Sequence, residues 1–493
     1  MNKTAIIIIW CAAGLLSSRL LAQNISFQRT YGGNYYSYCY SSLQLPDEGY
    51  LAAGSTSSFG TGSSDMYLIR TDSLGNLLWQ KTYGGSVIDA AYNMIKTNDG
   101  GYLLSGYTSS FGSGGYDFFM VKTDSLGNTL WTKSFGGTGW DFAYTAVQTP
   151  DSGYVVAGQT YSFGNGNADL YVLRLDYKGD TLWTKTYGGS MEEGCKSSLL
   201  TSDSCVVIAG YTTSNGDSLG DIFLLKINMN GDTLWSKTIG TPGEDRVNDI
   251  QSLGASGFIL AGYTNGIGAG QHDFYLVRTD VNGDTLWSIS QGGPHDDEAT
   301  SIRQDPSGDL IFIGPSSFGW DTTGQKKDIY LFRADANGYY KSGRTIGGLG
   351  NDYGNSLLLT SDGGFFVAGN TNSFGQGLSN IYLVKLDFSM YMPDSVIIGL
   401  KYPALTEKNK IFIYPNPFSA SAVLSLPDEN FTGNTCLDIY DACGKKVEEQ
   451  PLDFSVNGNY CQAIIERKNL PPGTYLYRIN DRKNPVAGIM MVK

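Results

Sequence analysis

One marker recurs along this chain at a nearly constant interval, and the interval constrains the fold more than any other feature. The marker is the first Gly after an aromatic or aliphatic residue in a repeated segment. It recurs at five steps of 52 residues and one of 55. These positions are Gly32, Gly84, Gly136, Gly188, Gly240, Gly292 and Gly347. A second Gly series runs from Gly54 to Gly369 with the same steps. A fixed period of this length is the signature of a repeat architecture.

Each period contains four short runs separated by turn signals. In the second repeat these runs read AYNMIKT, GYLLSGYT, YDFFMVKT and TLWTKSF. We name the predicted strands a, b, c and d in chain order. Four strands per repeat, with 64 Gly in 493 residues to supply tight turns, predict an all-β, seven-bladed β-propeller over residues 24–388.

The ends of the repeat region predict how the ring closes. The seventh repeat supplies strands a, b and c but lacks the Trp-containing strand d. Phe27 lies 52 residues before Trp79, and Tyr31 lies 52 before Tyr83. The N-terminal strand is therefore predicted to be the missing strand d of the last blade, which leaves no open edge between first and last blades. The alternative places SVIIGL there and makes the N-terminal strand a cap.

The N-terminus and the charge indicate where this chain acts. Residues 1–22 combine Lys3, an apolar stretch and a small-residue site at Ala22, which predicts a secretory signal peptide rather than a membrane anchor. The mature chain is then predicted to have no transmembrane segment. A net charge of −13 without a basic run argues against nucleic-acid binding. Six Cys follow the signal peptide, and their pairing stays open.

Three acidic positions recur with the repeat. One series opens the c–d turn, where Asp followed three residues later by Gly is typical of a hairpin loop. A second series opens strand c, and a third follows the Gly marker by five residues. We interpret the last two as struts between blades, and no cofactor is predicted; the alternative is a rim that binds Ca²⁺ or sugar hydroxyls. The third series is Asp89, Asp141, Glu193, Asp245, Asp297 and Asp352, with Ser37 in the first blade.

A binding site must distinguish one blade from the others, and the sixth repeat departs most. Its b–c loop is three residues longer and contains Trp320, while its d–a connection contains His295 beside Asp297. Trp140 is predicted on the same rim. Exposed aromatics beside carboxylates suit a sugar or a partner protein's hot spot. The alternative is that these are drifted loop residues.

Evidence for catalysis is weaker. His295 with two neighbouring Asp residues could act as a base, and paired acids could serve a glycosidase. The nucleophile elbow, the HExxH motif and the phosphate loop are absent from the sequence. No catalytic residue and no protein-bound metal are therefore predicted.

The repeat stops after Asp387, and residues 389–410 are predicted to be a linker. Residues 411–493 contain four ordered motifs near the C-terminus. They are Tyr414-Pro415-Asn416-Pro417, a hydrophobic strand followed by Gly444 and Lys445, a segment with Gly473 and Tyr475, and a final strand ending at Lys493. This region resembles the C-terminal sorting domain of proteins exported by the type IX secretion system of Bacteroidota. The 52-residue pattern resembles the bacterial β-propeller repeats of secreted proteins.

The sorting resemblance implies a small Ig-like β-sandwich, a secretion translocon and a sortase-like peptidase as partners. It also implies passage through the periplasm to the outer-membrane surface or the medium. Together these observations predict an exported propeller that binds a glycan or protein ligand. The alternatives are a polysaccharide-acting enzyme and a purely structural surface component.

Overall fold

The computed structural model describes residues 26–216, 219–317, 326–393, 397–398, 412–414, 419–427, 435–441, 445–457, 460–480 and 486–492. The predicted signal peptide therefore lies outside the described residues. The chain divides into two compact units, residues 1–399 and residues 400–493, and each has hydrophobic clusters of its own. No helix among the described residues combines the length and hydropathy that a membrane span needs.

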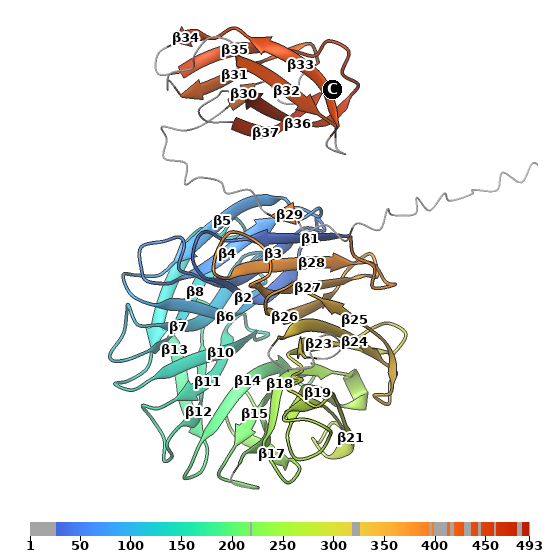
Figure 1. Cartoon of the computed structure of the whole chain (residues 1–493). Helices are drawn as coiled ribbons and strands as arrows, with labels where there is room; N and C mark the ends of the chain where they lie inside the picture. The colour runs from blue at the N-terminus through green and yellow to red at the C-terminus, as the bar shows by residue number, and fades with distance from the viewer. Residues whose placement is uncertain are drawn as a thin grey trace, which may run out of the picture. The chain divides into compact units, whose positions relative to one another are not determined.

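The first unit is a seven-bladed β-propeller, in which each blade is an antiparallel sheet of strands a to d (Figure 1). The a strands are β2 (Ser37–Gln44), β6 (Asp89–Lys96), β10 (Asp141–Gln148), β14 (Glu193–Leu200), β18 (Asp245–Ser252), β22 (Ser301–Gln304) and β26 (Asp352–Leu359). The b strands are β3 (Tyr50–Thr56), β7 (Tyr102–Thr108), β11 (Tyr154–Thr160), β15 (Val206–Thr212), β19 (Phe258–Thr264), β23 (Leu310–Ser316) and β27 (Phe365–Thr371).

Strands c and d form the outer half of each sheet and also occur in every blade. The c strands are β4 (Asp65–Thr71), β8 (Asp117–Thr123), β12 (Asp169–Leu175), β16 (Asp221–Ile227), β20 (Asp273–Thr279), β24 (Asp328–Ala334) and β28 (Asn380–Leu386). The d strands are β5 (Leu77–Tyr83), β9 (Thr129–Phe135), β13 (Thr181–Tyr187), β17 (Thr233–Ile239), β21 (Thr285–Gln291), β25 (Tyr340–Ile346) and β1 (Phe27–Tyr31). A short 3-10 helix, η1 (Gly254–Ser256), lies in an a–b connection.

The N-terminal strand completes the seventh blade, as the sequence predicts. β1 pairs antiparallel with β28, and Phe27 lies opposite Lys385. The segment proposed as the alternative closing strand lies on the outer side of β1, where β29 (Ile397–Ile398) pairs with it in parallel. The blade therefore has five strands in the order β26-β27-β28-β1-β29.

Hydrophobic clusters between adjacent sheets hold the ring together. One cluster joins Cys39 and Tyr50 of the first blade to Phe366 of the seventh, and the Tyr50 and Phe366 rings stack 3.9 Å apart. Strands b and c are buried almost throughout because both of their faces meet a neighbouring blade. This explains their continuous apolar runs.

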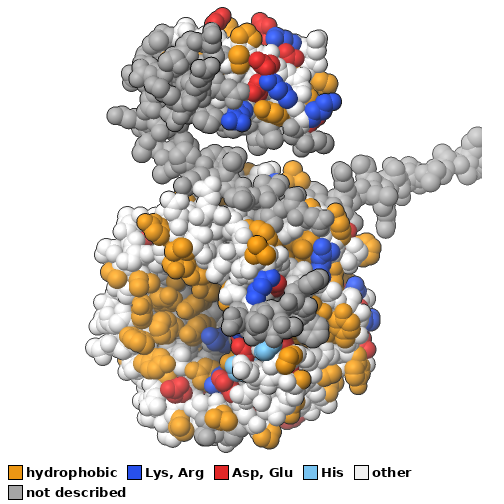
Figure 2. Space-filling model, in the orientation of Figure 1, with side chains coloured by type: hydrophobic (Ala, Val, Ile, Leu, Met, Phe, Trp, Pro, Cys, Tyr) orange, Lys and Arg blue, Asp and Glu red, His pale blue; other side chains and the backbone are white. Residues whose placement is uncertain are grey.

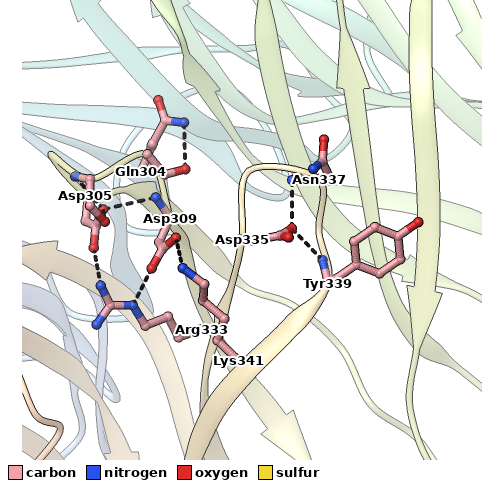
Figure 3. Close-up of polar contacts among 10 residues, drawn as sticks. Gln304, Asp305, Asp309, Arg333, Asp335, Asn337, Tyr339 and Lys341 are labelled. Carbon is pink, nitrogen blue, oxygen red and sulfur yellow. Dashed lines mark hydrogen bonds and ion pairs between the residues drawn. The ribbon is translucent and has the colours of Figure 1, made fainter.

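The c–d turns confirm the hairpin interpretation of their Asp residues. In the first blade, Asp72 Oδ1 accepts hydrogen bonds from the backbone N–H groups of Leu74 and Asn76, at 2.9 and 2.7 Å. Figure 3 shows the same arrangement in the sixth blade, where Asp335 accepts from the N–H groups of Asn337 and Tyr339. These Asp side chains stabilise turns.

A second repeated contact ties strand c to the a–b turn. Arg70, Lys122, Arg174, Lys226 and Lys385 each form an ion pair with an Asp of that turn. In the sixth blade Arg333 contacts both Asp305 and Asp309, and Lys341 also reaches Asp309 (Figure 3). These pairs lie at the end of the blades that carries the a–b and c–d turns.

The second unit is a small β-sandwich, as the sorting resemblance implies. Its strands are β30 (Phe412–Tyr414), β31 (Ser421–Pro427), β32 (Thr435–Tyr440), β33 (Lys446–Leu452), β34 (Ser455–Asn457), β35 (Tyr460–Glu466), β36 (Gly473–Asn480) and β37 (Val486–Val492). They form two sheets in the orders β30-β31-β35-β34 and β33-β32-β36-β37. Leu424, Leu437, Ile465 and Ile479 lie in the core between them.

Candidate functional site

The d–a face is our name for the end of the propeller that carries the d–a and b–c connections. Each a strand begins at this face and lies at the inner edge of its sheet. Figure 2 shows a hollow in the face, with hydrophobic side chains gathered on one side of it and charged and His side chains toward the other. The blades share one backbone pattern. The uneven distribution of hydrophobic and charged side chains therefore comes from residues that differ between repeats.

The aromatic surface is a continuous layer of ten partly exposed rings from the first three blades. Neighbouring ring centroids lie 5.0 to 6.4 Å apart along its length, which is the range of favourable aromatic pairs. Its members are Tyr36, Tyr38, Tyr40, Tyr92, Tyr107, Tyr116, Trp140, Phe142, Tyr144 and Tyr161.

A β-bulge near the start of strand a supplies the innermost members of this layer. The pairing of β6 with β7 skips Tyr92, and the pairing of β10 with β11 skips Tyr144. A bulge residue opposes no partner, and the bulge changes the direction of the side chains around it. The bulge positions given by the register shifts are Tyr40, Tyr92, Tyr144, Lys196, Asn248 and Asn355.

Burial among the other rings changes the chemistry of these hydroxyls. Desolvation, reinforced by the neighbouring tyrosines, raises the pKa of Tyr40 and of Tyr92 well above the ordinary value. Desolvation likewise raises the pKa of Tyr144. These phenols therefore stay neutral across the physiological range and offer a hydroxyl beside an apolar ring.

Two cations mark the boundary where the aromatic surface ends. Lys196 Nζ lies 4.4 Å from the centroid of Tyr144, and the guanidinium carbon of Arg246 lies 4.3 Å from the centroid of Tyr211. Both distances are within the range of cation–π attraction. Surrounding protein atoms desolvate the ammonium, and this lowers the pKa of Lys196.

The charged network occupies the same face on the fifth and sixth blades. His272 Nδ1 lies 3.2 Å from Asp296 Oδ1, and Lys327 Nζ lies 3.2 Å from both Asp296 Oδ2 and Glu298 Oε1. Glu244 contacts Arg246 at 3.1 Å and faces His272 at 3.8 Å. These six residues form a connected set of alternating charges.

A metal ion has little reason to enter this network. Ligand atoms of His272, Asp296 and Glu298 lie within 4.8 Å of one another. However, the ammonium of Lys327 already contacts both carboxylates. Although burial acts in the opposite direction, Glu298 and Asp296 together raise the pKa of Lys327 above its usual value. The positive charge that the two acids attract is therefore part of the protein.

Three of the four rim residues predicted from the sequence are described, and they lie in different environments. Trp140 belongs to the aromatic surface, is 55% exposed, and contacts Tyr116 and Tyr161. His295 is half-buried in its d–a connection. Asp297 is 1% exposed and accepts hydrogen bonds from Gly293 N–H and Ser316 Oγ, so it contributes to the frame of the face. Trp320 lies outside the described residues.

The acidic series that follow the Gly marker and open strand c meet at the blade boundaries. A Cβ built on Gly136 would lie 2.2 Å from Asp117 Oδ1 and 2.6 Å from Asp141 Oδ2. Asp117 belongs to the second blade and Asp141 to the third. Equivalent oxygens of the other acid pairs approach Gly84, Gly188, Gly240, Gly292 and Gly347. The Gly marker of the repeat is therefore the point where two acids from adjacent blades converge.

The sorting motif is described in part. Tyr414 ends β30, Gly473 begins β36, and the Lys445 N–H donates to Asp441 Oδ1 at 3.0 Å. Tyr475 lies in the sandwich core, and its hydroxyl donates to the Pro471 carbonyl at 2.8 Å. The other predicted motif residues, Pro415, Asn416, Pro417, Gly444 and Lys493, lie outside the described residues.

The model of one known protein family matches this unit. The match covers residues 412–493 and carries the description secretion system C-terminal sorting domain. Residues 412–493 are a secretion system C-terminal sorting domain. This domain identifies the chain as a protein exported by the type IX secretion system, which is a system of Bacteroidota. Cell-surface display or release into the medium follows from that route.

The propeller has more distant similarities. An alignment of 165 positions with the regulatory protein FlaEY of Caulobacter vibrioides has 26% identity and covers 28% of this chain and 17% of that protein. The WD40 domain of Neurospora crassa Pan2 covers 74% of this chain and 98% of its own at 11% identity, with a TM-score of 0.45. An α-L-arabinanase of Penicillium chrysogenum, solved with arabinobiose, covers 75% of this chain and 99% of its own at 11% identity, with a TM-score of 0.40. At these levels the similarities carry no information on ligand or activity.

Proposed function

We propose that this protein is an exported carbohydrate-binding propeller whose ligand lies on the d–a face. The observation that carries the proposal is the aromatic surface, whose ten rings are continuous and partly exposed in the first three blades. Aromatic rings stack against the apolar faces of sugars, and phenol hydroxyls and carboxylates bond their hydroxyl groups. Display at the cell surface or release would give the face access to extracellular polysaccharide.

The charged network supports a role in orientation. Glu244, Asp296 and Glu298 lie on the fifth and sixth blades, and each is paired with a cation. Asp296 and Glu298 both contact the ammonium of Lys327, and their remaining lone pairs can accept hydrogen bonds from sugar hydroxyls. This arrangement supports recognition of a polar ligand. The full mature chain is proposed to reach the surface by its sorting domain and to lose that domain to a sortase-like peptidase.

Binding of the full-length protein to a glycan array, followed by titration with the best glycan, tests the proposal. We expect Trp140→Ala to weaken binding at least tenfold, about 1.4 kcal/mol. The matched control is Leu349→Ala, because Leu349 is an exposed hydrophobic side chain in a d–a connection outside the aromatic surface. Failure to bind any glycan, together with capture of a defined partner protein that Trp140→Ala abolishes, would replace carbohydrate by protein as the ligand.

A further inference from the structure

The acid pairs at the blade boundaries present an electrostatic problem that the protein atoms leave unsolved. Twelve carboxylates form six pairs, and every one is at most 9% exposed. They are Asp65 with Asp89, Asp117 with Asp141, Asp169 with Glu193, Asp221 with Asp245, Asp273 with Asp297, and Asp328 with Asp352. The chain has 34 − 47 = −13 charges, and without these twelve it has 34 − 35 = −1. The pairs therefore hold twelve of the chain's 47 acidic groups in buried positions.

One oxygen of each acid is well satisfied. Asp89 Oδ2 accepts from Gly85 N–H at 2.8 Å and from Ser110 Oγ at 2.7 Å. Asp141 Oδ2 accepts from Gly137 N–H and Ser162 Oγ in the same way. These bonds fix the direction of each strand a carboxylate, whose Oδ2 is also the oxygen that approaches the Gly marker.

Several of those second oxygens have no partner. Asp89 Oδ1, Asp141 Oδ1, Asp273 Oδ1, Asp328 Oδ1 and Asp352 Oδ1 are buried and make no hydrogen bond. Asp273 Oδ1 and Asp328 Oδ1 are the oxygens that approach the Gly marker, whereas Asp328 Oδ2 contacts the Lys326 ammonium at 2.9 Å. An uncompensated buried charge costs several kcal/mol in a folded protein. A cation bound where the two acids converge would compensate this charge.

The seventh boundary shows what the chain does where the charge is absent. Asn380 takes the place of the strand c acid and Ser37 that of the strand a acid, so both members change together. Ser37 Oγ bonds Thr56 Oγ1 at 2.9 Å, and Asn380 Nδ2 donates to the Phe374 carbonyl at 3.1 Å. The fold therefore accepts a neutral pair, and the six acidic pairs need a reason beyond closure of the ring.

We propose that the six acidic blade boundaries are binding sites for a hard divalent cation of the Ca²⁺ class. Carboxylate oxygens that converge from two strands are the ligands that this ion prefers, with carbonyl oxygens and water completing the shell. Extracellular protein modules bind Ca²⁺ with dissociation constants of about 0.1 to 1 mM, and this protein is exported. The acid pairs are buried, whereas the rings of the aromatic surface are partly exposed, so the proposal stands independently of the carbohydrate ligand.

Calcium binding by the full-length protein tests this inference directly. Chelator-treated protein is dialysed against Ca²⁺ at pH 7, bound metal is measured by mass spectrometry, and thermal unfolding is followed with and without Ca²⁺. We expect several ions per chain and a higher unfolding midpoint with Ca²⁺. The absence of bound Ca²⁺ at millimolar concentration, with an unchanged midpoint, would overturn the proposal.

A variant that copies the seventh boundary locates the ions. Asp65→Asn with Asp89→Ser reproduces the neutral pair that this fold already uses, so it is expected to fold and to bind one ion fewer. The matched control, Asp180→Asn with Asp232→Asn, removes two exposed acids and is expected to bind as many ions as the parent. Equal loss in both variants would assign the bound Ca²⁺ to the general surface charge and contradict the proposal.

Discussion

Two sets of side chains recur in six of the seven repeats of this propeller, and they behave in opposite ways. The acid pairs are nearly identical at six boundaries, and they are buried. The bulge positions of strand a change from Tyr in the first three blades to Lys196 and then Asn248. Residues that are the same in most blades serve the structure of the ring. Residues that differ between blades can make one part of the d–a face a ligand site. We therefore assign frame and cation binding to the first set and ligand recognition to the second.

The largest effect on stability is expected at the Gly marker. Gly136→Ala places a Cβ 2.2 Å from Asp117 Oδ1 and 2.6 Å from Asp141 Oδ2, and these carboxylates are fixed by their own hydrogen bonds. We expect a loss of about 3 kcal/mol in the free energy of unfolding, measured with urea. The control Thr132→Ala, on the exposed part of β9, should stay within about 0.5 kcal/mol. Equal stabilities would mean that the boundary tolerates a side chain.

The pH dependence of unfolding in chelator should separate the acid pairs from the a–b turns. Burial, with the nearby Asp141 charge, raises the pKa of Asp117, so the folded state binds more protons and stability increases as pH falls through this raised pKa. By contrast Lys226 and Thr201 lower the pKa of Asp203 to about 2, so its contribution is lost between pH 4 and 2.

We therefore expect a maximum of the thermal midpoint near pH 4 without Ca²⁺. The double variant Asp117→Asn with Asp141→Ser should reduce the rise toward pH 4, because it removes one of the six pairs, and should leave the fall below pH 4 in place. A rise that survives in this variant unchanged would show that other groups cause it.

The smallest effect on stability is expected on the aromatic surface. Trp140 is 55% exposed and packs mainly against Tyr116 and Tyr161, so Trp140→Ala should lower the free energy of unfolding by about 1 kcal/mol or less. The same variant should lose glycan affinity, which separates recognition from stability. A loss as large as that of Gly136→Ala would make Trp140 part of the frame instead.

Periodicity explains why the fold was predictable and the site only in part. The start of strand c at Asp65 follows from the repeat, and so does the closing role of β1, whereas strand a of the second blade begins at Asp89, two residues before the predicted run. The spacing also places Tyr40, Tyr92 and Tyr144 in register, but it does not reveal a bulge. The alternation of inward and outward side chains in a regular strand does not predict that these three rings meet, because a bulge changes the side of the sheet on which a side chain lies. A search for the least regular position within each repeat would have found them.

The most direct test of the d–a face as a ligand site is oxidative footprinting of the full-length protein with its best glycan from the array. The account predicts that Tyr36, Trp140 and Tyr161, which are exposed members of the aromatic surface, become protected. Tyr177 and Tyr339, exposed at c–d turns, should be modified equally with and without glycan. Protection confined to the c–d turns, with the aromatic surface still fully reactive, would contradict it.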